Sequence, residues 1–140
     1  MSAGHRRYDD VRIGEAVPPE RLVFTVEEET VARFLAATGA APLPPEDGRP
    51  RQAPSMIAAV YLIALLRARR SPPGSIHARQ TIRFHRAVHV GETLSIQGSI
   101  LDKYTRKERP YIVLGFEARD RDGALVSSGT VTSIWGREDG

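Results

Sequence analysis

The sequence contains no cysteine, and this absence excludes disulfide bonds, thiolate nucleophiles and zinc sites with cysteine ligands. It also lacks a long hydrophobic run. The longest, Met56–Leu66, is much shorter than the roughly 20 apolar residues that a membrane-spanning helix needs. The first residues are polar, without the apolar segment of a secretory signal. We therefore expect a cytoplasmic protein that does not associate with membranes.

The chain also lacks a large excess of charge, since its formal net charge is +3 over 140 residues. Basic residues are spread among acidic ones, without the basic stripe interleaved with aromatics that is typical of a nucleic-acid-binding surface. No glycine-rich phosphate loop is present, and the histidines have no carboxylate beside them at ligand spacing. We expect no nucleic-acid partner, no metal ion and no other cofactor.

The sequence does have enough apolar residues for one hydrophobic core, at 41% of the chain. Its length suits a single domain, and neither an internal repeat nor a low-complexity tract divides it. We predict a loose N-terminal arm over residues 1–10 and one domain over residues 11–140.

A first helix is predicted near residues 26–38. Thr25 and Glu28 have the spacing of a capping box, in which each side chain accepts a hydrogen bond from a free N–H group at the helix start. Glutamates in the first turn suit the positive end of the helix dipole, and Gly39 can adopt the left-handed conformation that ends a helix. One face of the predicted helix, at helical spacing, consists of Val31, Phe34, Leu35 and Thr38.

A second helix is predicted over Met56–Leu66, after a proline-rich loop. Its residues are apolar on every side, and a helix without a polar face must be surrounded by protein. Ser55 is a candidate N-cap. The basic residues at the other end suit the negative end of the dipole, and they are Arg67, Arg69 and Arg70.

From residue 75 onwards the hydrophobic period changes to two, which indicates β-strands. Ile76, Ile82 and Phe84 alternate with polar neighbours, and Gly98 in the next strand is a possible bulge. An Asp-Gly turn at 120–123 connects the last two strands. The predicted strands cover residues 75–85, 94–101, 111–119 and 125–135, with a short early strand at 21–25.

These elements predict an α+β domain in which a curved antiparallel sheet wraps around one long buried helix. Only such a sheet would bury Met56–Leu66 on nearly all sides within one chain. This arrangement is the hot-dog fold. The alternative is an α+β domain whose apolar helix is covered by a second subunit.

Two motifs carry a resemblance to a known family. Residues 84–94 read F-x-R-x-V-x-x-G-E-T-L, and residues 120–129 read D-x-D-G-x-x-V-x-x-G. The first resembles the start of the sheet in MaoC-type acyl dehydratases, F-x-x-P-V-x-x-G-D-T-L, and the second resembles their final hairpin. The resemblance covers roughly residues 22–136. It implies a hot-dog dimer that binds acyl-CoA or acyl-carrier-protein thioesters in a tunnel at the subunit interface.

The acid–base motif of that family is missing here. Active members read S-G-D-x-N-P-[LIV]-H after the first helix, and their Asp and His move the protons of hydration and dehydration. Residues 38–45 of this chain read T-G-A-A-P-L-P-P. Ala40 stands at the Asp position and Pro44 or Pro45 at the His position, and neither side-chain type can transfer a proton. We therefore assign no catalytic residue.

The resemblance nevertheless implies a binding site. In the family, a backbone N–H group at the start of the buried helix holds the thioester carbonyl, and here that group would be the amide of Ser55 or Met56, after Ala53. We expect Ala40 and Pro42 to line the same pocket. A basic cluster in a predicted hairpin would meet the phosphates of the ligand, or be a solvated turn; it contains Lys103, Arg106 and Lys107, with Arg109 beside them.

Other groups are weaker candidates for the missing chemistry. Glu46 and Asp47 follow the proline-rich loop, and a solvated turn is the favoured interpretation for both. The histidines at 77, 85 and 89 lie near the start of the sheet, where a surface or interface role is favoured over catalysis.

Three functions fit the sequence. The first is a hydratase or dehydratase subunit without the acid–base pair, forming a homodimer or a heterodimer with a hot-dog subunit that carries it. The second is a stand-alone hot-dog enzyme with altered chemistry, such as a thioesterase, isomerase or cyclase of secondary metabolism. The third is a non-catalytic module that binds acyl-CoA.

Overall fold

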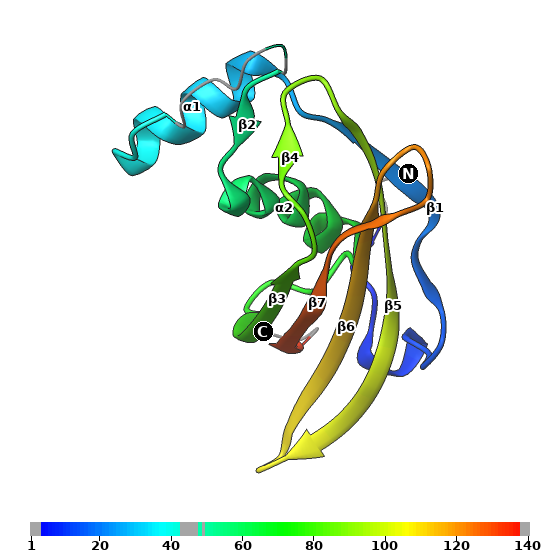
Figure 1. Cartoon of the computed structure of the whole chain (residues 1–140). Coiled ribbons are helices and arrows are strands. Elements are labelled where there is room, and N and C mark those ends of the chain that lie inside the picture. Colours follow the sequence, from blue (N-terminus) through cyan, green and yellow to red (C-terminus); the bar gives the residue numbers. More distant parts are fainter. Residues whose placement is uncertain (1–3, 43–47, 49, 138–140) are drawn as a thin grey trace.

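The computed structural model describes residues 4–42, 48 and 50–137. A five-stranded antiparallel sheet dominates the fold, and it curves around a single long helix, α2 (Ala58–Ala68), which lies on its concave side (Figure 1). The order of the strands across the sheet is β1 (Ala16–Thr25), β5 (Thr93–Arg106), β6 (Arg109–Arg119), β7 (Leu125–Ile134) and β3 (Ile76–Phe84). The predicted α+β class and hot-dog arrangement are confirmed.

Smaller elements lie around the upper end of this sheet. Helix α1 (Glu28–Thr38) projects to one side, and a short ladder of β2 (Gln52–Ala53) with β4 (Val88–His89) leads into the 3-10 turn Ser55–Ile57 that precedes α2 (Figure 1). A second 3-10 turn covers Tyr8–Asp10. No helix of the described ranges has the length and apolar character needed to cross a membrane.

The capping box predicted for α1 is wrong. Thr25 is the last residue of β1, where it pairs with Thr93 of β5 and places its hydroxyl 3.3 Å from the Thr93 hydroxyl. The N-cap of α1 is Glu27, and no side chain caps the helix there. Pairing with β5 therefore places Thr25 in the sheet, although the local sequence assigns it to the start of the helix. Gly39 ends α1 in the left-handed conformation, at φ 72°, as predicted.

Helix α2 is buried on one face and open on the other. Its buried residues pack against the inward side chains of the sheet, whereas the side chain of Ile63 is 52% exposed. The prediction that this helix is surrounded on all sides is therefore wrong for the single chain. The curved sheet of one chain covers only one face of the helix, and the residues on that face are Ala58, Tyr61, Leu62 and Leu65.

Two bulges alter the predicted strand faces. A register shift between His77 and Arg79 turns Ile76 to the opposite face from Ile82, so the alternation predicted for this strand is interrupted. A second shift lies beside Ile100, and Gly98 pairs in regular register with Phe116, so the bulge predicted at Gly98 is wrong.

The N-terminal residues contact the rest of the fold. The Arg6 N–H donates to the carbonyl of Arg70 over 2.9 Å, and the indole N–H of Trp135 donates to the carbonyl of Arg6 over 2.8 Å. The Arg6 guanidinium also pairs with Glu15. These contacts attach the segment that the sequence predicts as an arm to both α2 and the end of β7.

Candidate functional site

The start of the α2 segment presents free backbone N–H groups. Pro54 is extended, at φ −61° and ψ 143°, and its carbonyl accepts the first hydrogen bond of the turn, from the N–H of Ile57 over 2.9 Å. Helix geometry leaves the N–H groups of Ser55 and Met56 without an acceptor inside the helix. Both side chains are exposed, Met56 to 45%. In the single chain this helix start therefore lies at the surface.

A pocket lies beside the ladder that leads into this turn. Ala53 pairs with Val88, and both side chains are buried. The N–H of Val90 continues the ladder by donating to the carbonyl of Arg51 over 2.8 Å. The pocket has a volume of about 480 Å³, and its lining residues are Pro50, His89, Val90, Gly91 and Glu92.

The loop after α1 contains the residues that the sequence resemblance aligns with the family's acid–base motif. Ala40 and Pro42 are exposed, and the Ala40 N–H donates to the Thr38 hydroxyl over 3.4 Å. Neither residue lines the pocket beside Ala53. The two prolines that align with the family's histidine, and the candidate acids Glu46 and Asp47, lie outside the described residues.

Within the described part of the chain, His89 and Glu92 form the one histidine–carboxylate pair, with Nδ1 and Oε2 3.8 Å apart. Glu92 accepts two hydrogen bonds from the Arg86 guanidinium, at 2.6 and 3.1 Å, and one from the His89 backbone N–H at 2.7 Å. Burial opposes its charged form, but these hydrogen bonds outweigh burial and hold the pKa of Glu92 below its usual value. A carboxyl group that is already ionised at neutral pH cannot act as a proton donor.

Arg86 also binds Asp120, whose Oδ2 accepts from Nη2 over 2.8 Å. Hydrogen bonds to both carboxylates raise the pKa of Arg86, and the bond from Arg86 lowers the pKa of Asp120. Arg86, Glu92 and Asp120 therefore form a fully charged network whose groups are occupied with one another. We interpret it as structural.

The other two histidines near the sheet do not line the pocket beside Ala53. His77 and His85 are exposed on and just after β3, and the His85 Nε2 lies 2.9 Å from the Ser128 hydroxyl. Across the described ranges, no three histidine or acidic side chains come together as a possible metal site.

The basic cluster lies at the tip of the β5–β6 hairpin. Lys107 and Glu108 form the turn with positive φ angles of 51° and 63°, and the exposed Arg106 pairs with Arg109 across the hairpin. Lys103 contacts the N-terminal segment, with its ammonium 4.1 Å from the centre of the Tyr8 ring. The hairpin tip lies at the opposite end of the molecule from β2 and the start of α2 (Figure 1). One chain therefore does not bring the two predicted parts of the binding site together.

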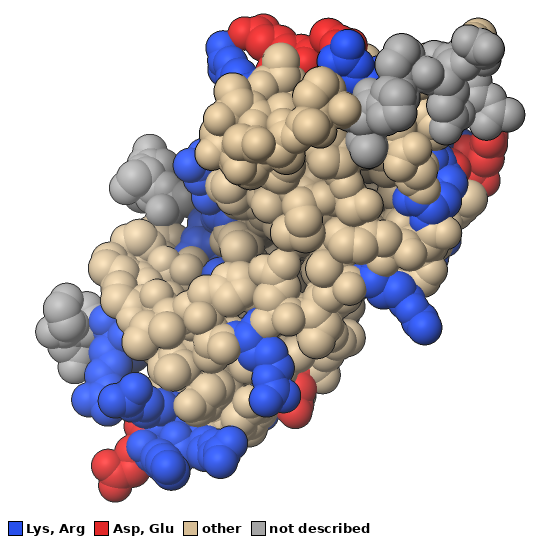
Figure 2. Space-filling model, turned by 60° about the vertical axis from the view of Figure 1, so that its left-hand side comes forward, with Lys and Arg blue, Asp and Glu red and all other residues tan. Residues whose placement is uncertain are grey.

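The surface on the α1, α2 and β3 side is mainly uncharged in its middle. Lys and Arg side chains gather mostly at the edges of this face, above all at its lower end (Figure 2). An uncharged centre suits burial of the apolar part of a ligand or of a second subunit.

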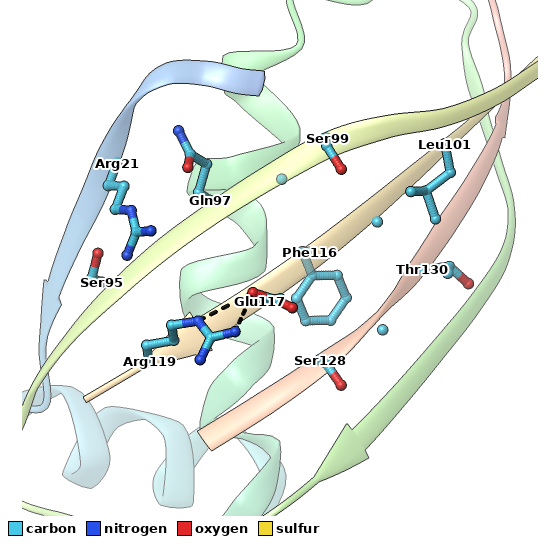
Figure 3. Close-up of a pocket in the computed structure, with 13 residues that line it drawn as sticks. Arg21, Ser95, Gln97, Ser99, Leu101, Phe116, Glu117, Arg119, Ser128 and Thr130 are labelled. Atoms are coloured by element: carbon cyan, nitrogen blue, oxygen red, sulfur yellow. Dashed lines mark hydrogen bonds and ion pairs between the residues drawn. The ribbon is translucent and has the colours of Figure 1, made fainter. Parts of the chain in front are cut away.

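A polar hollow on the outer face of the sheet was not predicted. It has a volume of about 450 Å³, and its Arg119 is bound to Glu117 at 2.8 Å (Figure 3). The only sequence signal for it is the alternation of polar residues along β5 and β7. Its hydroxyl and basic side chains are Ser95, Ser99, Ser128, Thr130, Arg21 and Arg119.

No protein-family model matches the sequence, and no curated protein matches it either. Solved structures do. An R-hydratase from Pseudomonas aeruginosa, in its unliganded form, has a TM-score of 0.74 and 20% identity, over 94% of this chain and 86% of that one. The 3R-hydroxyacyl-ACP dehydratase complex HadBC from Mycobacterium tuberculosis, truncated at a C-terminus, has a TM-score of 0.73 and 20% identity, over 87% of this chain and 96% of that one.

A MaoC-like dehydratase from Rhodospirillum rubrum is a third similar structure. Its TM-score is 0.66 and its identity 15%, over 92% of this chain and 96% of that one. Similarity along nearly the whole chain at such low identity establishes a shared fold. The chain thus has the fold of MaoC-like hydratases and dehydratases, which is the hot-dog fold that its sequence motifs predict.

Proposed function

We propose that this chain binds an acyl thioester of coenzyme A or of an acyl-carrier protein, as the subunit of a hydratase or dehydratase complex that lacks the acid–base pair. One observation carries the proposal: the exposed Ala40 follows the left-handed Gly39 at the end of α1, where the family motif has its acid. A methyl group binds no proton, so the reaction needs a group from elsewhere.

The free N–H groups at the start of α2 support a role in binding. Two backbone amides and the positive end of the helix dipole favour a carbonyl oxygen that gains negative charge. This contribution needs no particular side chain at Ser55 or Met56, so it is retained although the acid–base pair is absent. The chain would hold the thioester, and the partner would move the protons.

The free edge of β3 supports a second hot-dog subunit. This strand pairs with β7 on one side only, and the side chains of Ile76 and Phe84 are 50% and 40% exposed. An edge strand with unpaired backbone groups and apolar side chains is suited to pairing with another chain. A partner there would also approach the open face of α2, on the same side of the molecule (Figure 1).

The test is hydration of a short enoyl-CoA, followed as loss of the enoyl absorbance. We expect no turnover with the purified chain, and turnover when it is purified together with a hot-dog subunit that carries the intact S-G-D-x-N-P-x-H motif. The matched control is that subunit with its Asp changed to Asn, which should leave the complex inactive.

The alternatives predict different outcomes in the same assay. Turnover by the purified chain alone would identify a stand-alone enzyme and overturn the proposal. Saturable acyl-CoA binding with neither turnover nor a hot-dog partner would favour the binding module.

A further inference from the structure

Arg69 is a buried cation directly after the last turn of α2. Its side chain is 8% exposed, its Nε donates to the carbonyl of Leu66 over 3.2 Å, and its Nη1 donates to the Ser133 hydroxyl over 2.6 Å. The guanidinium lies 5.6 Å from the centre of the Trp135 ring. Burial lowers the pKa of Arg69 to about 10, so the group is still charged at neutral pH.

No carboxylate of the described ranges forms an ion pair with Arg69, although a buried charge normally has a partner of opposite sign. Its Nη2 makes no hydrogen bond to another described residue. Every fully buried side-chain nitrogen in the described part of the chain has a partner, so this nitrogen is not fully buried. Arg69 is one of the residues that line a pocket of about 510 Å³ at the C-terminal end of α2.

Further positive charge surrounds this pocket. Arg67 and Arg70 line it together with Arg69, and neither forms an ion pair with a carboxylate of the described residues. The nearby Arg6 is already neutralised by Glu15. Three arginines without a carboxylate partner among the described residues therefore line one pocket. Its other walls are polar or apolar side chains, namely His5, Ser71, Ile63 and Leu66.

We infer that this pocket binds the phosphate group of a small organic molecule, with Arg67, Arg69 and Arg70 as the hydrogen-bond donors. A phosphate dianion suits several guanidinium groups better than a single carboxylate does, because it carries more charge and accepts forked hydrogen bonds. The half-buried Leu66 offers a surface for the organic part.

The site is separate from the thioester-binding end of the same helix. Helix α2 has 11 residues, which at 1.5 Å per residue places its two ends about 16 Å apart. The inference therefore does not depend on the proposed function, and it can be tested with inorganic phosphate and pyrophosphate alone.

Trp135 is a built-in reporter for this test. It is the only tryptophan of the chain, it is 2% exposed, and it lies against Arg69. We expect a saturable change of its fluorescence when phosphate or pyrophosphate is added at constant ionic strength, and no such change with chloride. A change that is linear, or the same with chloride, would overturn the inference.

A pair of double variants tests the assignment. Arg67→Gln with Arg70→Gln should weaken pyrophosphate binding at least about tenfold, which corresponds to a loss of about 1.4 kcal/mol. The matched control, Arg21→Gln with Arg121→Gln, removes the same charge elsewhere and should bind as the wild type does. Equal weakening in both variants would mean that net charge alone is responsible, and the inference would fail.

A titration in the presence of coenzyme A assigns the source of the phosphate. Displacement of pyrophosphate by coenzyme A would mean that the site holds a phosphate of the thioester ligand. Independent binding of the two would mean that a second phosphorylated molecule uses it. Both outcomes are consistent with a phosphate site, which only the fluorescence titration and the double variants can overturn.

Discussion

Single glycines allow neighbouring strands of the sheet to approach one another closely. A Cβ atom at Gly98 would lie 2.8 Å from the Leu114 side chain and 2.9 Å from the carbonyl oxygen of Gly115. At Gly129 it would collide with the backbone carbonyl of Thr81 and lie 2.9 Å from the Phe116 ring. Backbone atoms cannot move aside as side-chain ends can, so a larger residue at Gly129 would force β3 and β7 apart.

We predict that Gly129→Ala lowers the free energy of unfolding by about 3 kcal/mol, at the upper end of the usual cost of overpacking. Urea denaturation followed by circular dichroism measures this. Ser95→Ala, on the outer face of β5, is the control and should change the free energy by no more than about 0.5 kcal/mol. A neutral Gly129→Ala would show that β3 and β7 are further apart than described.

A buried hydroxyl pair joins α2 to the sheet. The Tyr61 and Ser127 hydroxyls are hydrogen-bonded, and both residues are buried. Burial raises the pKa of Tyr61, although the bond to Ser127 acts in the other direction, so the phenol keeps its proton at neutral pH.

We predict that Tyr61→Phe lowers the free energy of unfolding by about 1–3 kcal/mol, because the Ser127 hydroxyl loses its partner in the core. Adding Ser127→Ala should recover part of this loss, since the double variant has no buried hydroxyl left without a hydrogen-bond partner at this position. The control is Tyr104→Phe. The Tyr104 ring is stacked on Tyr111 and 38% exposed, so this change should leave the free energy of unfolding nearly unchanged. A further loss in the double variant would contradict the interpretation.

At the scale of elements, the Arg86 network connects three loops. Arg86 lies between β3 and β4, Glu92 between β4 and β5, and Asp120 between β6 and β7. The network therefore holds together the end of the sheet that lies beside the β2–β4 ladder. Its two carboxyl groups have lowered pKa values in the folded chain, from 4.5 for Glu92 and 3.8 for Asp120.

The lowered pKa values of Glu92 and Asp120 determine in which direction the stability of the fold changes with pH. A carboxyl group with a depressed folded pKa contributes stability that is full above its unfolded pKa and is lost as the pH falls through the folded pKa. We predict that Arg86→Met is less stable than wild type at pH 7, and that the two free energies of unfolding converge as the pH is lowered below the unfolded value of 4.5 for Glu92.

Urea unfolding at a series of pH values tests this convergence. Arg33→Met removes an exposed pair with Glu29 in α1 and serves as the matched loss of an arginine. Its curve should run close to that of the wild type at every pH. Parallel curves for wild type and Arg86→Met down to low pH would exclude the linkage.

At the scale of the whole molecule, two exposed apolar features occur on one side. The open face of α2 presents Ile63, and the free edge strand β3 presents Phe84. The middle of this side is largely uncharged (Figure 2). A second hot-dog chain that pairs along β3 would cover both, as the dimer expected from the sequence requires.

We predict that the chain alone is a dimer by light scattering, and that Phe84→Asp raises the dimer dissociation constant at least about tenfold, or about 1.4 kcal/mol. Val23→Asp is the control, because Val23 is 72% exposed on β1 at the opposite edge of the sheet. It should leave the dimer intact. A monomeric wild type, or equal effects of the two variants, would rule out pairing along β3 in the homodimer.

The sequence alone determined the class of fold and most of its elements. Period-two alternation identified the long strands, the run Met56–Leu66 identified the helix inside the sheet, and Gly39 identified the end of α1, because burial and backbone freedom act on neighbouring residues. The sequence also predicts that the family's acid is replaced by Ala40, since that prediction depends on residue identity and on a motif.

Only the tertiary structure decided which residues meet. It placed Thr25 in a strand, turned Ile76 to the other face through a bulge, and left one face of α2 open, because strand register and the reach of the sheet depend on residues far apart in the sequence. The same holds for the pocket at the C-terminal end of α2. From the sequence alone, Arg69 is a cation at the end of a helix. The packing of β7 against Arg69 is what buries it without a counter-charge.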